Sequence, residues 1–200
     1  MWGADFCESM KHELRKRISA HLTGLDDGTV HQHSVAVAKQ LATLPAFADA
    51  KSLAVYVSFG NEIETHNLIC QLLKRGRHVC VPAFQNGEYL VAEIQDFDQD
   101  LVAGKLNILE PKHPRRVSAV QSEVWLIPGV AFDRNGNRLG RGKGYFDALL
   151  QSAPGLKIAL AHDFQLLNEV PIEPHDVRMD FIITENQVVQ CTRNHEPHHH

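Results

Sequence analysis

The chain has 200 residues, of which 44% are hydrophobic and 22% charged, and its formal net charge is −4 with the histidines neutral. This composition fits one soluble domain, and the charge excludes a general attraction to nucleic acid or anionic membranes. No run of about 18 apolar residues predicts a membrane span, and the N-terminus lacks the apolar region of a secretory signal. Cys7, Cys70, Cys80 and Cys191 form no CxxC pair, so we expect four reduced cysteines in a cytosolic protein.

The first two predicted elements are amphipathic helices. Residues 11–25 place leucine and isoleucine on one stripe and basic residues around it. Lys11 and Arg15 are one turn apart, so one face of this helix can present both. Residues 29–44 repeat the apolar pattern, and Asp26 is suitably placed to cap their N-terminus.

Histidine is abundant, with 13 residues in the chain. His31 and His33 fall in the second predicted helix, two residues and about 200° of rotation apart. We therefore do not expect these two side chains to bind one metal ion. His198–His200 follow His195 at the C-terminus in the manner of a purification tag, and we leave them out of the functional interpretation.

A βαβ unit is predicted next. Residues 53–59 (LAVYVSF) form a short β-branched and aromatic run that is typical of a buried strand. Thr65 suits the N-cap of a helix that ends at Gly76, and residues 78–84 (HVCVPAF) predict a second strand. This spacing is long enough for a right-handed crossover between parallel strands. Residues 87–94 predict a further strand, at the edge of the sheet.

The second half of the chain continues the alternation of strands and helices. Residues 95–118 show little periodicity, and one interpretation is a mobile loop that covers a substrate. Residues 124–132 (VWLIPGVAF) give the strongest strand pattern in the chain. A helix is predicted over 145–150 and a strand over 156–162. The segments FIIT and VVQC, on either side of residues 185–187, predict a final pair of strands.

This order of elements predicts an α/β fold, with a three-layer, open and mostly parallel sheet and helices on both faces. No linker divides the chain, so residues 11–191 are predicted to form a single α/β domain. Residues 1–10 are interpreted as an N-terminal extension, with Met1 and Met10 both open as the natural start. Residues 192–200 are interpreted as a tail that a tag could have supplied.

Glycine and arginine alternate in the segment that follows the strand at 124–132. Because ligands of open α/β sheets bind outside the carboxyl ends of the strands, Gly140, Gly142 and Gly144 suit a loop whose N–H groups contact an anion. Neighbouring cations could bind phosphate oxygens. The spacing excludes a P-loop, a dinucleotide-binding fingerprint and an EF-hand. From the residues alone, an anion-binding loop and a solvated surface turn both remain open.

A longer string around these glycines carries a resemblance. Residues 128–147, PGVAFDRNGNRLGRGKGYFD, closely resemble the signature of 5-formyltetrahydrofolate cyclo-ligases, also called methenyltetrahydrofolate synthetases. Weaker similarities follow in the family's order: residues 11–15 (KHELR), 56–58 (YVS) with 61–65 (NEIET), 81–82 (VP), 109–111 (LEP), and 175–185. The resemblance spans roughly residues 11–185, and it implies a fold like that of sugar-phosphate isomerases and CoA transferases.

The resemblance implies an ATP- and Mg²⁺-dependent ligase of folate metabolism. Members of the family convert 5-formyltetrahydrofolate to 5,10-methenyltetrahydrofolate by phosphorylating the formyl oxygen and closing the ring from N10. By similarity, Arg141 and Lys143 are the expected catalytic cations. The expected ATP-binding residues are Lys11, Arg15, Arg138, Leu139, Gly140, Arg141, Gly142, Lys143, Gly144, Tyr145 and Phe146.

The resemblance also implies a folate side of the site. Glu62 matches the acid of the E-[IV]-[DE]-T turn, which could accept hydrogen bonds from a pterin, and Val57 matches a folate-facing strand position. Tyr145 would contact the substrate as well. Family members often have a second tyrosine at the position of Phe146, so this chain lacks one hydroxyl there.

The acids nearest the expected phosphates are Asp133 and Asp147, which we take as candidate Mg²⁺ ligands. Asp133 could instead cap the turn at Asn135 and Gly136. Glu110, Asp176 and Asp180 stay unassigned.

Two other functions are weighed against the cyclo-ligase. A different enzyme of the same architecture could use a phosphate-binding loop, but it would not need the pair Lys11 and Arg15 or the complete 128–147 string. A non-catalytic nucleotide- or folate-binding protein should have lost the cations that this loop retains. The expected partners are ATP and 5-formyltetrahydrofolate, with no nucleic acid or membrane, and the expected state is a monomer or weak dimer.

Overall fold

An eight-stranded, mostly parallel sheet forms the centre of the computed structural model, which describes residues 4–104, 108–114, 116–117, 122–151, 153–173 and 176–192. Side by side, its strands are β13 (Val188–Gln190), β12 (Phe181–Ile183), β10 (Leu156–Leu160), β7 (Val124–Ile127), β1 (Ser52–Val55), β2 (His78–Gln85), β3 (Glu88–Ile94) and β6 (Arg116–Val117). Neighbours from β12 through β2 run parallel, and the outer pairings are antiparallel. The predicted α/β class is therefore confirmed.

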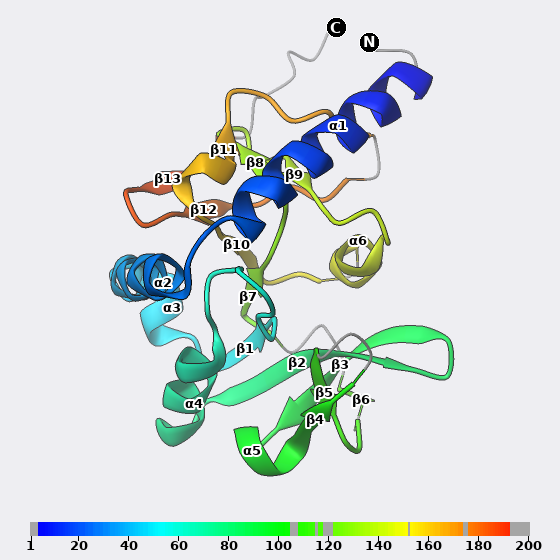
Figure 1. Cartoon of the computed structure of the whole chain (residues 1–200). Coiled ribbons are helices and arrows are strands. Elements are labelled where there is room, and N and C mark those ends of the chain that lie inside the picture. Colours follow the sequence, from blue (N-terminus) through cyan, green and yellow to red (C-terminus); the bar gives the residue numbers. More distant parts are fainter. Residues whose placement is uncertain are drawn as a thin grey trace, which may run out of the picture.

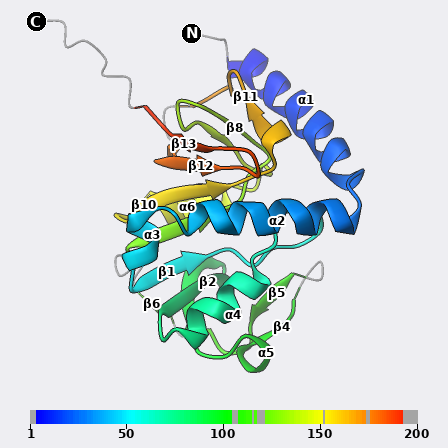
Figure 2. The same ribbon diagram turned by 90° about the vertical axis from the view of Figure 1, so that its left-hand side faces the viewer.

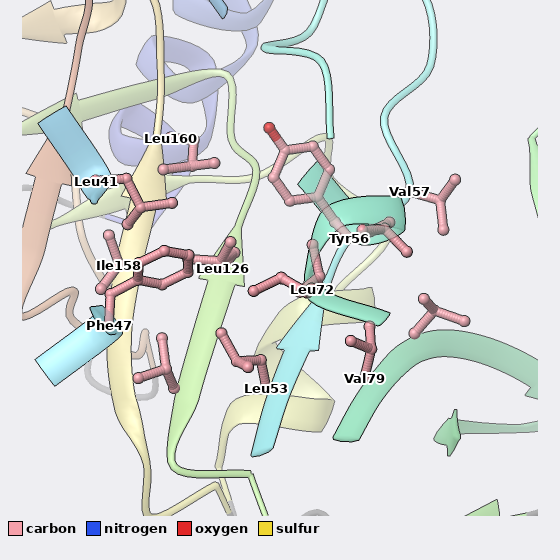
Figure 3. Close-up of a cluster of buried hydrophobic side chains, with 14 of the residues drawn as sticks. Leu41, Phe47, Leu53, Tyr56, Val57, Leu72, Val79, Leu126, Ile158 and Leu160 are labelled. Atoms are coloured by element: carbon pink, nitrogen blue, oxygen red, sulfur yellow. The ribbon is translucent and has the colours of Figure 1, made fainter. Parts of the chain in front are cut away.

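Helices cover both faces of this sheet because successive residues of each buried strand point to opposite sides. Leu53, Leu126 and Ile158 pack in one apolar cluster with residues of α2 (Asp27–Leu41), α3 (Pro45–Asp49) and α4 (His66–Lys74). Figure 3 shows part of this cluster, and Figure 2 shows α2 lying across that face with α4 below it. On the opposite face, Trp125 and Ala159 pack in a cluster that includes residues of α6 (Tyr145–Leu150).

Smaller elements surround the main sheet. A three-stranded sheet consists of β11 (Leu166–Leu167), β8 (Ala131–Asp133) and β9 (Arg138–Leu139). Helix α1 (Ala4–Thr23) packs on it, with Ile18 and Leu22 against Val130 and Leu139, and descends diagonally from the upper right in Figure 1. The remaining elements are α5 (Phe97–Asp100), β4 (Leu101–Ala103), β5 (Leu109–Pro111) and the 3-10 helix η3 (Asp163–Gln165).

Several predicted elements differ from the observed ones in their ends. The first helix already begins at Ala4, so residues 4–10 are its first turns. The predicted strand 124–132 is two strands, because the chain bends at Pro128 and Gly129. A Cβ added at Gly129 would lie 2.5 Å from the Cζ atom of the buried Phe132, so a larger residue here would have to displace that ring. Strand β3 is not at the edge of the sheet as predicted, because β6 pairs with its outer side.

The irregular segment 95–118 contains short elements in its described part: α5, β4, β5 and β6. The final strand pair is present as the antiparallel β12 and β13. All four cysteines lie in the described residues, and none of them forms a disulfide. Within the described ranges, no helix has the length and apolar character that a bilayer crossing requires. The C-terminal histidines lie outside the described residues.

Candidate functional site

The glycine- and arginine-rich segment divides into a structural half and a cavity-facing half. Its first half is the turn between β8 and β9, which Asp133 organises. The fully buried Asp133 carboxylate accepts hydrogen bonds from the backbone N–H groups of Asn135, Asn137 and Val170 and from the Asn137 side chain, at 2.8–3.1 Å. Arg134 donates to Gln187, away from the cavity. These contacts argue against Asp133 as a magnesium ligand, because its oxygens are already fully engaged by the protein.

The second half of the segment lines a cavity of about 550 Å³. The cavity lies beyond the carboxyl ends of β1 and β7, where an open α/β sheet binds its ligands. Gly142 and Gly144 have φ angles of +89° and +63°, which glycine adopts without strain. The candidate residues on its wall are Val57, Glu62, Arg138, Gly140, Arg141, Gly142, Lys143, Gly144, Tyr145, Phe146 and Asp147.

Arg141 connects the loop to the opposite wall of the cavity. Its guanidinium donates to Glu62 Oε1 at 2.8 Å and lies 4.4 Å from the centre of the Phe59 ring. Glu62 is 8% exposed, and its other oxygen accepts the Phe59 N–H. Burial raises the pKa of Glu62, and the charge and hydrogen bond of Arg141 offset part of that rise. The predicted phosphate-binding cation and the predicted pterin-binding acid therefore meet in one cavity.

The two remaining loop cations differ in their partners. Arg138 is 6% exposed, and its guanidinium pairs with Asp147 Oδ1 at 2.5 Å and donates to the Pro128 carbonyl at 3.3 Å. These bonds fix the start of α6 relative to β9. Lys143 is exposed on the cavity wall and has no hydrogen bond or ion pair with any described residue. Lys143 is therefore placed to bind a ligand without first giving up a partner among the described residues.

The first helix reaches the loop through Arg15 and not through Lys11. The Nε atom of Arg15 donates to the Gly140 carbonyl at 3.1 Å, and its guanidinium lies beside Gly142. Lys11 is 4% exposed and binds Glu173 at 2.7 Å and Asp176 at 3.3 Å. Burial alone would lower the pKa of Lys11, but these two carboxylates outweigh it and raise that pKa.

Leu139 is also turned away from the cavity, because its buried side chain packs against α1. Of the predicted ATP-binding residues, Lys11, Arg15 and Leu139 are therefore not among the residues that line the cavity. Arg15 still touches the loop backbone at Gly140.

Aromatic rings form another part of the cavity wall. Tyr145 packs edge-on against Tyr89, with ring centres 4.2 Å apart, and also against Phe146. Tyr89 in turn packs against Phe84, its cross-strand partner at the tip of the β2–β3 hairpin. Burial, with smaller effects from Glu110 and Tyr89, raises the pKa of Tyr145 well above its usual value, so its hydroxyl is a neutral donor. A flat ring system would fit against these faces.

Sequence reasoning missed Phe59, Phe84 and Tyr89 as cavity residues. A signal for the last two exists, since they flank Asn86 and Gly87, the residue pair typical of a tight hairpin turn. Both turn residues have positive φ angles, as such a turn requires. The residues 108–110 also line the cavity, so the described part of the 95–118 segment supplies a wall that includes Glu110.

His31 and His33 point to different partners, as the predicted helix geometry requires. His31 bonds the exposed Glu64, whereas His33 lies 2.9 Å from the ring nitrogen of His162. Neither histidine lines the cavity.

The sequence and the fold both match known proteins. The profile of the 5-formyltetrahydrofolate cyclo-ligase family matches residues 7–185. The chain belongs to this family. The enzyme of that name from Escherichia coli (strain K12) is 34% identical over 159 residues, which cover 76% of this chain and 87% of that protein. The mitochondrial one from Arabidopsis thaliana is 29% identical and covers 91% of this chain and 76% of its own length.

Solved structures agree with this assignment. The NMR structure of Aquifex aeolicus 5,10-methenyltetrahydrofolate synthetase superposes with a TM-score of 0.83 at 31% identity, covering 96% of this chain and 100% of that one. The synthetase structure from Mycoplasma pneumoniae shares the fold, with a TM-score of 0.70 at 24% identity. The family name makes this chain a ligase and places it in folate metabolism.

Proposed function

We propose that the chain converts 5-formyltetrahydrofolate to 5,10-methenyltetrahydrofolate, with ATP consumed to ADP and phosphate. The observation that carries the proposal is the contact between Arg141 and Glu62, because it puts a cationic, glycine-rich loop and a buried carboxylate on one cavity. Family membership supports the same reaction. A cavity with both a polyanion-binding wall and an aromatic wall suits the joint binding of a nucleotide and a folate.

The ATP phosphates would bind along residues 140–144, with Lys143, which has no ion pair within the described part of the chain, as one cation and Arg141 as the second. Arg15 would support the loop from behind through the Gly140 carbonyl. In this proposal Lys11 acts indirectly, since its ion pairs with Glu173 and Asp176 hold the helix that carries Arg15. Leu139 likewise contributes by packing the loop against α1.

The folate would bind on the side of Glu62. A carboxylate can accept paired hydrogen bonds from the amino and N–H groups of a pterin, and Glu62 is buried enough to make such bonds strong. Val57 and the rings of Tyr145 and Phe146 would pack against the flat parts of the substrate. For Glu62 to bind the pterin, its bond with Arg141 must open or be shared with the ligand.

The reaction is a phosphoryl transfer followed by ring closure. The formyl oxygen attacks the γ-phosphorus of ATP and ADP leaves. N10 then attacks the activated carbon and loses its proton, and the oxygen departs with the phosphate. Catalysis of this kind depends on alignment and on neutralising charge. Lys143 and Arg141 would neutralise the transferring phosphoryl group, and Glu62 with the aromatic wall would hold the formyl oxygen in line.

Magnesium fits this cavity through Asp147 and not through Asp133. Asp147 lines the cavity and gives one oxygen to Arg138, so it can supply a single carboxylate. Mg²⁺ bound to ATP needs one or two carboxylates beside phosphate and water. When bound, the ion would neutralise phosphate charge and orient the γ-phosphoryl group.

The finer fold class is also a proposal. The sheet order and the two helical layers support a likeness to the sugar-phosphate isomerase and CoA transferase architecture. Reduced, unpaired cysteines support a cytosolic location. The expected monomer or weak dimer remains a prediction.

The test is a turnover assay with Mg-ATP and 5-formyltetrahydrofolate that follows the near-ultraviolet absorbance of the methenyl product. We expect a rise that requires both substrates and releases one ADP per product. Replacing ATP with a non-hydrolysable analogue is the matched control. Absence of an ATP-dependent rise from folded protein would overturn the proposal.

A further inference from the structure

A second cluster of chemically active side chains lies outside the cavity. It consists of His33 from α2, His162 just after β10, and Glu185 just after β12. His33 Nδ1 lies 2.9 Å from His162 Nδ1 and 3.5 Å from Glu185 Oε1, and all three candidate ligand atoms lie within 4.8 Å of one another. His162 is fully buried, and the Glu185 side chain is 13% exposed.

The hydrogen bonds of His162 determine which of its nitrogens is free. Its Nε2 lies 2.9 Å from the backbone carbonyl oxygen of Asn61, which can only accept a hydrogen bond. The neutral ring must therefore carry its proton on Nε2. The lone pair of Nδ1 then points toward Nδ1 of His33. This is the arrangement of a metal-ligating histidine, whose second N–H is held by a carbonyl.

Glu185 is oriented by a bond of its own. Its Oε2 accepts the backbone N–H of Asp163 at 2.9 Å, which leaves Oε1 on the side of His33. Hydrogen bonds from outside the cluster thus orient His162 and Glu185. His162 Nδ1 and Glu185 Oε1 remain available, and both lie near His33 Nδ1.

The two distances from His33 Nδ1, 2.9 Å to His162 and 3.5 Å to Glu185, are close to those of a coordination shell. Ligand atoms about 2.0–2.2 Å from a tetrahedral ion are separated by roughly 3.3–3.6 Å. The two histidine nitrogens need to part by a few tenths of an ångström to reach that spacing. We propose that His33, His162 and Glu185 bind a late first-row transition metal of the Zn²⁺ class, as a three-ligand site separate from the substrate cavity.

The donor set argues for this class of ion. Two imidazoles and one carboxylate suit Zn²⁺ or Co²⁺, whereas Mg²⁺ prefers oxygen ligands and retains its waters. The site is therefore expected to bind the Mg²⁺ that accompanies ATP only weakly.

Such an ion would join three parts of the fold at one point. It would tie α2 to the ends of β10 and β12, and through the His162–Asn61 bond to the turn after β1. Asn61 also donates to the carbonyls of Leu22 and Leu25 and immediately precedes Glu62. Metal binding would thus stiffen the turn that carries a cavity carboxylate.

The test titrates Co²⁺ into the full, metal-stripped chain and follows the visible absorbance of tetrahedral cobalt, with Zn²⁺ added to displace it. His33→Ala is the main variant, because His33 is on the cluster's solvent side. His31→Ala is the matched control on the same helix, since His31 is 70% exposed and bonded to Glu64. All proteins carry the same C-terminal histidines, so metal bound there cancels in the comparison.

We expect wild type and His31→Ala to show a strong tetrahedral cobalt spectrum that one equivalent of Zn²⁺ removes. His33→Ala should lose that spectrum and bind Zn²⁺ more than about tenfold more weakly at this site. Glu185→Gln keeps an acceptor for the Asp163 N–H and should also weaken binding. Zn²⁺ should raise the melting temperature of wild type more than that of His33→Ala. Equal cobalt spectra in wild type and folded His33→Ala, or no tetrahedral spectrum at all, would overturn the proposal.

Discussion

Arg141 links the two halves of the proposed site at the level of single residues. Its guanidinium is about half exposed, packs on Phe59 and pairs with Glu62, so one side chain touches both the loop and the opposite wall. The sequence motif predicted that Arg141 would face phosphate. It could not predict the contact with Glu62, which is 79 positions away in the chain.

Arg141→Ala should lower kcat/KM for ATP by on the order of a hundredfold, because a charge on the transferring phosphoryl group is removed. The free energy of unfolding should fall by about 1–3 kcal/mol, because the buried Glu62 carboxylate loses its hydrogen-bond donor. Steady-state kinetics and urea unfolding measure the two effects. Arg134→Ala is the control, because Arg134 is on the same loop but bonds Gln187. Similar activity losses in both variants would refute a specific role for Arg141.

Glu62 predicts a pH dependence of stability. Burial raises its pKa from the ordinary value of 4.5, Arg141 faces it, and Tyr56 beside it stays neutral because burial raises the tyrosine pKa. Folding therefore takes up a proton between the two Glu62 pKa values, and the contribution of Glu62 to wild-type stability falls as pH rises from about 4.5 through the raised value. Glu62→Gln lacks this dependence.

The stability of Glu62→Gln relative to wild type should accordingly increase with pH across that window. Urea unfolding of both proteins at a series of pH values measures it, and other titrating groups cancel in the difference. A difference that stays constant with pH would show that the carboxylate is not desolvated in the folded protein.

At the level of elements, the β8–β9 hairpin and the loop after it have separate tasks. The hairpin turn is built around Asp133, and the loop from Gly140 onward faces the cavity. The sequence motif of residues 128–147 does not separate the turn from the loop, because residues needed for folding and residues that face the cavity follow one another directly. Of the two roles considered for Asp133, magnesium ligand and cap of the turn, the hydrogen bonds support the cap.

Asp133→Ala separates these two roles. It leaves three backbone N–H groups and one side-chain amide without their acceptor, so the free energy of unfolding should fall by about 3–5 kcal/mol. Asp147→Ala should have a smaller effect on stability but weaken Mg²⁺ activation. Thermal unfolding and Mg²⁺-dependence of the rate measure both. A stable Asp133→Ala protein with weakened Mg²⁺ activation would restore Asp133 as a metal ligand.

At the level of the whole molecule, the alternating strand and helix pattern was sufficient to predict the parallel sheet and its two helical layers. The βαβ unit of β1, α4 and β2 formed as predicted, because its strands are apolar and its helix has one apolar face. The aromatic wall of the cavity was not predicted. Tyr89 and Tyr145 meet only when the β2–β3 hairpin lies next to α6, and that contact depends on tertiary packing.

For Lys11, the sequence predicted a contact with ATP, but the tertiary structure does not place this residue among those that line the cavity. Its spacing from Arg15 predicted a shared role on one helix face. Glu173 and Asp176, far along the chain, supply the carboxylates that bind Lys11. Arg15 instead contacts the glycine-rich loop, at the Gly140 carbonyl. A pattern within one helix does not reveal which of its residues another segment will cover.

We propose that the γ-phosphoryl group of ATP is transferred to the formyl oxygen in this cavity. The most direct measurement uses 5-formyltetrahydrofolate labelled with ¹⁸O in the formyl group and analyses the released phosphate by mass spectrometry. We expect one ¹⁸O atom in each phosphate formed, in step with the methenyl product. Unlabelled phosphate, with the ¹⁸O released to water, would contradict it.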